Sequence, residues 1–212
     1  MNLENYFWYF NKSQGFSKKT CEDIIKHGNL QKDKLALTGK YTDIKKLSEK
    51  EIKDLKTKRD SNIVWLNDQW IYNELFPFIH TANQNSKWNF EWDFAESCQF
   101  TKYNKGQYYD WHCDSFNKTY GKEKGINFEG KIRKLSVTIN LSEGEEYDGG
   151  DLQFDYRNED GPDLKSNIVT AEIAREKGAV VVFPSHIWHR VTPVTKGTRY
   201  SLVVWLIGKP FK

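Results

Sequence analysis

A histidine and a carboxylate stand two residues apart in YDWHCDSF, the stretch that runs from Tyr109 to Phe116. On a β-strand, side chains alternate between faces, so His112 and Asp114 point one way and Cys113 the other. A histidine and a carboxylate on one face can bind the same metal ion. Taken alone, the pair is a weak signal that a polar strand end without a ligand explains better, so further residues must decide.

A second histidine completes a set of ligands. His189 lies 75 positions after Asp114 (189 minus 114), far enough along the chain to return on another strand of a barrel. Two histidines and one carboxylate form a facial triad, which leaves coordination positions open and is typical of non-haem Fe(II) oxygenases. Zinc accepts the same ligand types, so the triad alone leaves the choice of metal open.

An arginine follows in TRYSLVVW, where Arg199, Ser201 and Trp205 share one face of an expected strand. A guanidinium deep in an apolar barrel can hold a carboxylate bidentately, and an unpaired buried arginine is costly. Arg199 therefore needs an anionic partner, which is either a ligand or a structural acid. Trp205 either lines a pocket for that ligand or belongs to the core.

The elements that must position these residues change character along the chain. Three helical segments are expected before residue 88: SKKTCEDIIKHG, with Ser17 as N-cap and Gly28 as the stop, SEKEIKDLKTKR, with Ser48 and Glu51 as a capping box, and DQWIYNELFPFIHTAN, with Asp68 as N-cap. From about Trp88 onward the apolar residues alternate with period two, as in strands.

The predicted fold class is α+β, with a double-stranded β-helix (jelly-roll) core over residues 89–208 backed by N-terminal helices over 1–88. A length of 212 residues fits one domain over 1–212. Two polar segments, 115–131 and 155–167, are long for hairpin connections and are therefore disordered or functional.

The composition and charge of the chain limit the classes of partner and the compartment that we expect. The net charge is +3, from 32 basic and 29 acidic residues interspersed along the chain, which gives no electrostatic footprint for nucleic acid. The N-terminus lacks the pattern of a signal peptide, and no apolar run is long enough for a membrane span, so we expect a cytoplasmic protein without membrane association. Cys21, Cys98 and Cys113 are irregularly spaced and indicate neither a disulfide framework nor a thiolate zinc site.

At these positions the chain resembles the 2-oxoglutarate and Fe(II)-dependent dioxygenases and, within them, the prolyl 4-hydroxylase-like group. In that family a His-x-Asp pair and a distal histidine bind iron, and an arginine or lysine about ten residues after that histidine binds the far carboxylate of 2-oxoglutarate. The matching residues here are His112, Asp114, His189 and Arg199.

The resemblance covers about residues 59–207 and includes YNKGQYYDWHCD, RKLSVTINLSEGEEYDGGDLQF and RDSNIVWL, the last similar to a segment that lines the peptide groove. It implies that Tyr103 is a second contact for the cosubstrate, beside Arg199, Ser201 and Trp205. Arg133 shares parity with Leu135 and Val137, which places it either at the barrel rim, in contact with substrate or cosubstrate, or in a surface salt bridge. The residues expected at the substrate are Arg59, Tyr109, Arg133 and Trp188.

The resemblance implies hydroxylation coupled to decarboxylation of 2-oxoglutarate, with release of succinate and carbon dioxide. It implies Fe(II), 2-oxoglutarate and dioxygen, with ascorbate as an optional addition, and a peptidyl proline as substrate. Segment 115–131 is then placed to close over the substrate as a lid. Two alternatives remain open: the same chemistry on a free amino acid or other small molecule, which predicts a closed pocket, and a jelly-roll module that binds metal and anion without turnover.

Overall fold

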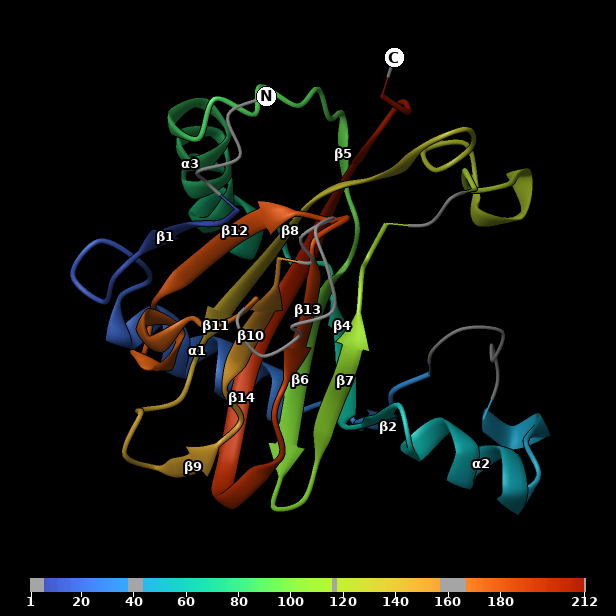
Figure 1. Ribbon diagram of the computed structural model, residues 1–212, viewed down its shortest axis with the longest axis vertical. Coiled ribbons are helices and arrows are strands. Elements are labelled where there is room, and N and C mark those ends of the chain that lie inside the picture. The colour runs from blue at the N-terminus through green and yellow to red at the C-terminus, as the bar shows by residue number, and fades with distance from the viewer. Residues whose placement is uncertain (1–5, 38–43, 116–117, 157–166, 212) are drawn as a thin grey trace.

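The computed structural model describes residues 6–37, 44–115, 118–156 and 167–211. Two antiparallel β-sheets pack against each other, and helices cover the outer face of the larger one (Figure 1). The α+β prediction with N-terminal helices backing a β core is therefore confirmed. None of the helices in these described ranges is long and apolar enough to span a membrane.

The major sheet has nine strands, two of which, β5 (Phe94–Ala95) and β9 (Tyr147–Gly149), pair only with β14. The other strands lie side by side in the order β1 (Trp8–Phe10), β12 (Val180–Pro184), β8 (Ile132–Asn140), β14 (Val194–Gly208), β6 (Cys98–Asn104), β4 (Asn62–Leu66) and β2 (Lys34–Leu35).

The minor sheet has five strands and carries most of the chemistry. Their order is β11 (Ile168–Thr170), β10 (Leu152–Asp155), β13 (Trp188–Val191), β7 (Tyr108–His112) and β3 (Arg59–Asp60). Phe154 of β10 packs with Val181 and Phe183 of β12, so these apolar side chains join the two sheets.

Three helices form where the sequence predicts them, at α1 (Lys18–Asn29), α2 (Glu49–Lys56) and α3 (Gln69–Asn85). The Ser17 cap and the capping box before α2 are confirmed. Gly28 does not stop α1, because the helix continues to Asn29 and Gly28 packs against the ring of Phe100. Asp68 makes no side-chain cap, since its carboxylate binds His27 at 2.8 Å instead.

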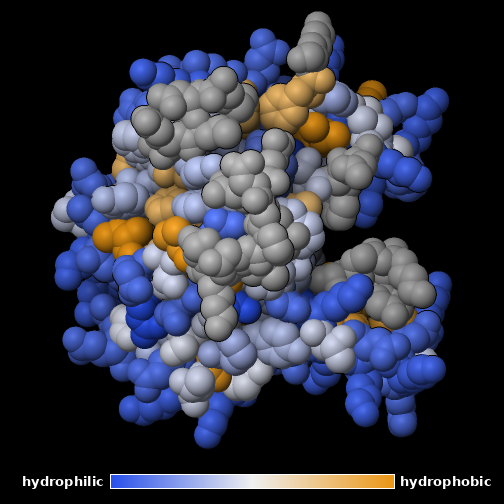
Figure 2. Space-filling model, viewed as in Figure 1, coloured by the Kyte–Doolittle hydropathy of each residue, from blue (hydrophilic) through white to orange (hydrophobic). Residues whose placement is uncertain are grey.

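A core of apolar side chains lies between α1, α3 and the major sheet, and includes Ile24, Ile71, Leu75, Val137 and Leu202. Figure 1 shows α2 apart from this core, beyond the edge of the minor sheet formed by β3 and β7. In Figure 2, the outline of the molecule is hollowed between α2 and the loop after β7. The end of β7 lies beside this hollow.

Strands were missed at both ends of the predicted helical region. Two strands of the major sheet come from the first 66 residues: β1 (Trp8–Phe10) pairs with β12, and β4 (Asn62–Leu66) pairs with β6. Conversely, the alternating aromatic residues after Trp88 form no strand before Phe94. Most of the predicted polar segment 155–167 lies outside the described residues.

Candidate functional site

The three predicted metal ligands come together at the end of the minor sheet. His112 ends β7 and is paired in register with His189 on β13, and Asp114 follows β7 by two residues. Nε2 of His112 lies 3.8 Å from Oδ1 of Asp114, and Nε2 of His189 lies 3.4 Å from Oδ2. All three ligand atoms lie within 4.8 Å of one another, so one ion can contact all of them.

Backbone carbonyls orient both imidazole rings towards this point. Nδ1 of His112 lies 2.7 Å from the carbonyl oxygen of Asp110, and Nδ1 of His189 lies 2.9 Å from that of Ile187. A carbonyl oxygen only accepts, so each Nδ1 carries the hydrogen and each Nε2 presents its lone pair. This is the arrangement of metal-binding histidines, in which an outer partner fixes the tautomer.

The Asp114 carboxylate is held by neighbours that the sequence did not single out. Ser136 donates from Oγ to Oδ2 at 2.8 Å, and Ser136 and Ser185 share a hydrogen bond of 2.9 Å. The backbone amide of Asp114 donates to the carbonyl of Ser185 at 2.8 Å. The carboxylate is therefore fixed by buried hydroxyls behind it while it faces the two histidines.

Electrostatics keep two of the ligands in the form that binds a cation. Burial, followed by the neighbouring His189, lowers the pKa of His112 to about 3, so the ring is neutral at pH 7. Burial favours the neutral form of Asp114, but His189, His112 and Arg133 outweigh it and lower the pKa to about 2. A neutral imidazole and a carboxylate anion are the protonation states that metal binding requires.

Arg199 is a buried cation without an acidic partner. It is 2% exposed, its Nε has no hydrogen-bond partner, and no carboxylate of the described residues pairs with it. It lies opposite Tyr103 in the pairing of β14 with β6, with its guanidinium carbon 5.6 Å from the centre of that ring. Of the two expected partners, the structural acid is absent from the described chain, so the site fits the carboxylate of a ligand.

Gly150 makes room for this arginine. It has a φ of +64°, and a Cβ atom built there would lie 3.0 Å from Cδ of Arg199. Ser201 pairs with Thr101 in the same register, and Gln99 donates to Thr101 at 2.9 Å, so polar groups continue along this face of the sheet. The predicted cosubstrate set of Tyr103, Arg199 and Ser201 thus lies on one face of adjacent strands.

Arg133 forms a salt bridge, one of its two predicted roles, but inside the protein. It binds Glu96 bidentately at 2.6 and 2.8 Å, and its guanidinium carbon lies 3.8 Å from the centre of the Trp205 ring. The hydroxyl of Tyr120, in the loop after β7, donates to Oε1 of the same Glu96 at 2.9 Å. The indole Nε1 of Trp205 has no hydrogen bond of normal geometry but lies near enough to Asp114 to help lower its pKa.

Arg133 does not lie on the same face of β8 as Leu135 and Val137, although their spacing predicted a shared face. Leu135 and Val137 belong to the core between the major sheet and the helices, on the face opposite the metal centre. Arg133 reaches the metal side because the pairing of β8 with β14 shifts between Leu206 and Ile207, which reverses the alternation. A bulge of this kind has no signal in the hydrophobic pattern.

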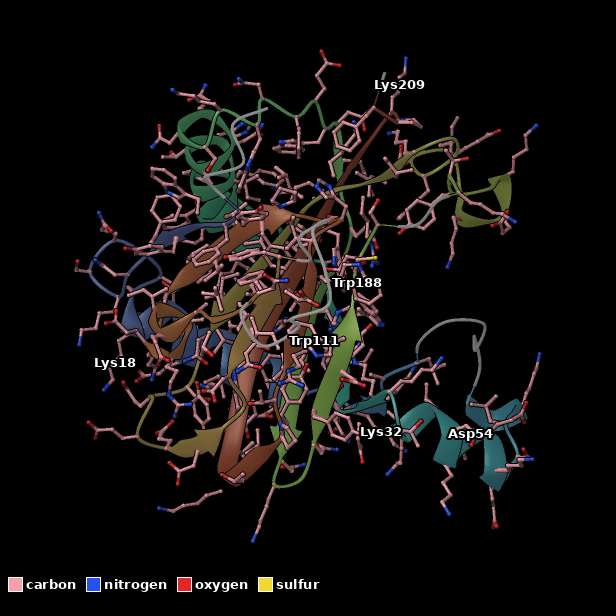
Figure 3. The ribbon with its side chains drawn as sticks, viewed as in Figure 1. Lys18, Lys32, Asp54, Trp111, Trp188 and Lys209 are labelled. Carbon is pink, nitrogen blue, oxygen red and sulfur yellow. The ribbon has the colours of Figure 1, made fainter. Side chains whose placement is uncertain are left out.

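Tyr109 stacks on the ligand His112, and Arg59 stacks on Tyr109. The ring of Tyr109 lies parallel to that of His112, with centres 3.5 Å apart, and the Arg59 guanidinium lies 4.4 Å from the centre of the Tyr109 ring. Figure 3 shows Trp188 close to the end of β7, but strand alternation puts its side chain on the opposite face of β13 from His189. Its contact with substrate remains a prediction.

A sequence model of the 2OG-Fe(II) oxygenase superfamily matches residues 98–207, just over half of the chain. A curated PKHD-type hydroxylase of Methylobacillus flagellatus is 34% identical over 108 residues, which are 50% of this chain and 41% of that protein. The match thus spans less than half of the relative's length.

Solved structures share the fold over nearly the whole chain. A prolyl-4-hydroxylase of Pseudomonas putida superposes with a TM-score of 0.63 at 18% identity, covering 99% of this chain and 96% of that one. A Trichoplax adhaerens prolyl hydroxylase, solved with a peptide fragment of the hypoxia inducible factor oxygen degradation domain, gives a TM-score of 0.62 at 16% identity. It covers 96% of this chain and 84% of that one.

Proposed function

Because the chain belongs to the 2OG-Fe(II) oxygenase superfamily, we propose that it is a 2-oxoglutarate-dependent dioxygenase that hydroxylates a peptidyl proline and releases succinate and carbon dioxide. The observation that carries this proposal is the combination of the His112, Asp114 and His189 cluster with Arg199, a buried cation that no described acidic side chain neutralises.

Each residue has a distinct role in this scheme. His112, Asp114 and His189 would hold Fe(II), while Arg199 and Tyr103 would bind the distal carboxylate of 2-oxoglutarate. When bound, the iron and the keto acid supply the oxidising chemistry that inserts one oxygen atom from dioxygen into a substrate C–H bond. The buried side chains of Trp205 and Tyr103 keep water from the major-sheet side of the site, which limits reaction of the oxidant with anything but the substrate.

Exposed aromatic surface beside Trp205 supports a chain-like substrate over a free amino acid, for which an enclosed pocket is expected. The side chain of Trp65 on β4 is 45% exposed, and the centre of its ring lies 6.2 Å from that of Trp205. Aromatic surfaces of this kind suit a polyproline II chain.

The first test is an anaerobic titration of the metal-free protein with Fe(II) and then 2-oxoglutarate, monitored by the visible charge-transfer band of a chelated keto acid. The band should form in the wild type and be absent in His189→Ala. A folded wild-type protein without the band would instead support zinc chemistry or a non-catalytic binding module. Proline peptides are then assayed for the gain of one oxygen atom, with and without ascorbate.

A further inference from the structure

A second buried arginine lacks an acidic partner. Arg59 is 4% exposed, its Nε donates to Oγ of Ser61 at 2.9 Å, and one of its terminal nitrogens, Nη2, is buried without any hydrogen bond. Within the described parts of the chain, no aspartate or glutamate forms an ion pair with it. Arg133 and Arg175, in contrast, are matched by the carboxylates of Glu96 and Asp151.

The contacts that Arg59 does make are too weak to compensate for its burial. Removing an unpaired cation from water is costly even after relaxation of the surrounding protein. The stack on Tyr109 and the hydrogen bond to Ser61, the contacts of the Arg59 side chain among the described residues, each offset only a small part of that cost. Arg199 is likewise buried without an acidic partner among the described residues, and the proposed function assigns it to a ligand carboxylate. By the same reasoning, Arg59 also fits a ligand carboxylate.

The position of Arg59 separates it from the cosubstrate. Arg59 lies on β3 at the edge of the minor sheet, paired in register with Tyr109, whose ring stacks on His112. Arg199 lies on the major sheet. In the proposed scheme 2-oxoglutarate has one carboxylate at the metal and the other at Arg199, so it has none left for Arg59.

We propose that Arg59 binds a carboxylate of the substrate, and that the protein therefore prefers an anionic substrate to a neutral proline-rich chain. This inference rests on the proposed function. The carboxylate is either the terminal one of a chain that ends in proline or the side chain of an acidic residue beside the target proline. Both present the same planar acceptor to the guanidinium fork.

Two matched pairs of N-acetylated peptides distinguish these sources. One pair ends in proline, as the free acid or as the amide; the other has an internal proline followed by Glu or by Gln, with the C-terminus amidated in both. We expect kcat/KM for one acid to exceed that for its neutral partner at least about tenfold, because the neutral partner leaves the buried cation unpaired.

The variant Arg59→Gln should reduce this ratio to near one, and Arg59→Lys should retain part of it. The matched control is Arg190→Gln on the same sheet, whose guanidinium lies 4.6 Å from the ring centre of Trp111 and which should keep the full ratio. If Arg59→Gln does not fold, the test rests on Arg59→Lys. A ratio of kcat/KM between acid and neutral partner that is the same in Arg59→Lys as in the wild type would then contradict the proposal.

Binding is followed in parallel, as a change in the charge-transfer band when each peptide is added without oxygen. Equal effects of acids and neutral partners overturn the inference and leave the proposed function standing. No effect of any peptide on a band that forms normally overturns the inference together with the prolyl substrate, and leaves only the 2-oxoglutarate-dependent chemistry supported. Absence of the band in the wild type overturns the proposed function and the inference with it.

Discussion

Nη1 of Arg133 lies 3.9 Å from Oδ1 of Asp114, while the rest of the Arg133 guanidinium is bound bidentately to Glu96. The positive charge of Arg133 therefore lies next to Asp114, and the bidentate contact with Glu96 fixes its position. Because Tyr120 donates to the same Glu96, the loop after β7 is linked through two ionic groups to the metal centre. Closure of this loop over a substrate, as predicted from its position, would begin from a loop already anchored at Tyr120.

Replacing Tyr120 by Phe should release the loop without disturbing the metal. The lost hydrogen bond is worth about 1 kcal/mol, so hydrogen exchange over residues 120–131 should accelerate severalfold and the KM of a substrate should rise. Metal affinity, measured by calorimetry, should be unchanged. Tyr108→Phe is the control, because that hydroxyl binds the carbonyls of Lys56 and Thr57, away from the loop. Equal acceleration in both variants would show that Tyr120 is no anchor.

Ser136→Ala should weaken metal binding although Ser136 touches no metal. Its hydroxyl fixes Asp114, and removing such an outer partner typically costs 10–100-fold in metal affinity. Calorimetric titration of the metal-free protein with Mn(II) measures the change. Ser13→Ala, at an exposed serine that hydrogen-bonds Asn11, provides the reference. A Ser136→Ala protein with wild-type affinity would mean that the carboxylate is positioned by its backbone alone.

Gly150→Ala should raise the KM for 2-oxoglutarate about tenfold. An added methyl group would lie 3.0 Å from Cδ of Arg199 and displace the anchor, besides the strain of a positive φ. Gly106→Ala separates the two effects, because Gly106 also has a positive φ, +87°, but has no atom within 4 Å of the added carbon. That control should lose about 1–2 kcal/mol of stability and keep its KM. A similar rise in both variants would contradict steric displacement of Arg199.

The sequence predicted the residues of the metal centre because their chemistry is local. His112 and Asp114 are joined by strand alternation, and His189 and Arg199 follow from the ligand set and its charge. The supporting residues were not predictable in this way. Ser136 and Glu96 are common polar residues whose role depends on which strands become neighbours, and Arg133 depends on a shift in register between β8 and β14.

The secondary structure was likewise predictable where its signals are local and was missed where it depends on distant neighbours. Caps and periodicity identified α1, α2 and α3, whose signals lie within one segment. Strand β1 was missed because three residues with an aromatic pattern become a strand only when β12 offers them an edge. The aromatic alternation after Trp88 was misread because Phe90 and Trp92 pack on the helix core without pairing to a strand.

The metal-free protein should lose stability as the pH falls below about 6.5. In the unfolded chain His112 takes up a proton near that ordinary pKa, whereas in the folded protein burial lowers its pKa to about 3. Between these values the unfolded state binds the extra proton, so the free energy of unfolding falls with falling pH, by about 1.4 kcal/mol per unit. From pH 6.5 to pH 5 the loss is about 1.6 kcal/mol, because the slope at pH 6.5 is only half its full value.

The lowered pKa of Asp114 acts in a different window. Its contribution to stability is present above its ordinary pKa near 3.8 and is lost only as the pH falls to about 2, so it leaves the range from 6.5 to 5 unaffected. Denaturant unfolding of the metal-free protein at pH 7.5, 6.5 and 5 measures the dependence. His112→Gln should flatten the slope, because a neutral amide does not titrate. The same slope in the wild type and in His112→Gln would place the titrating group elsewhere.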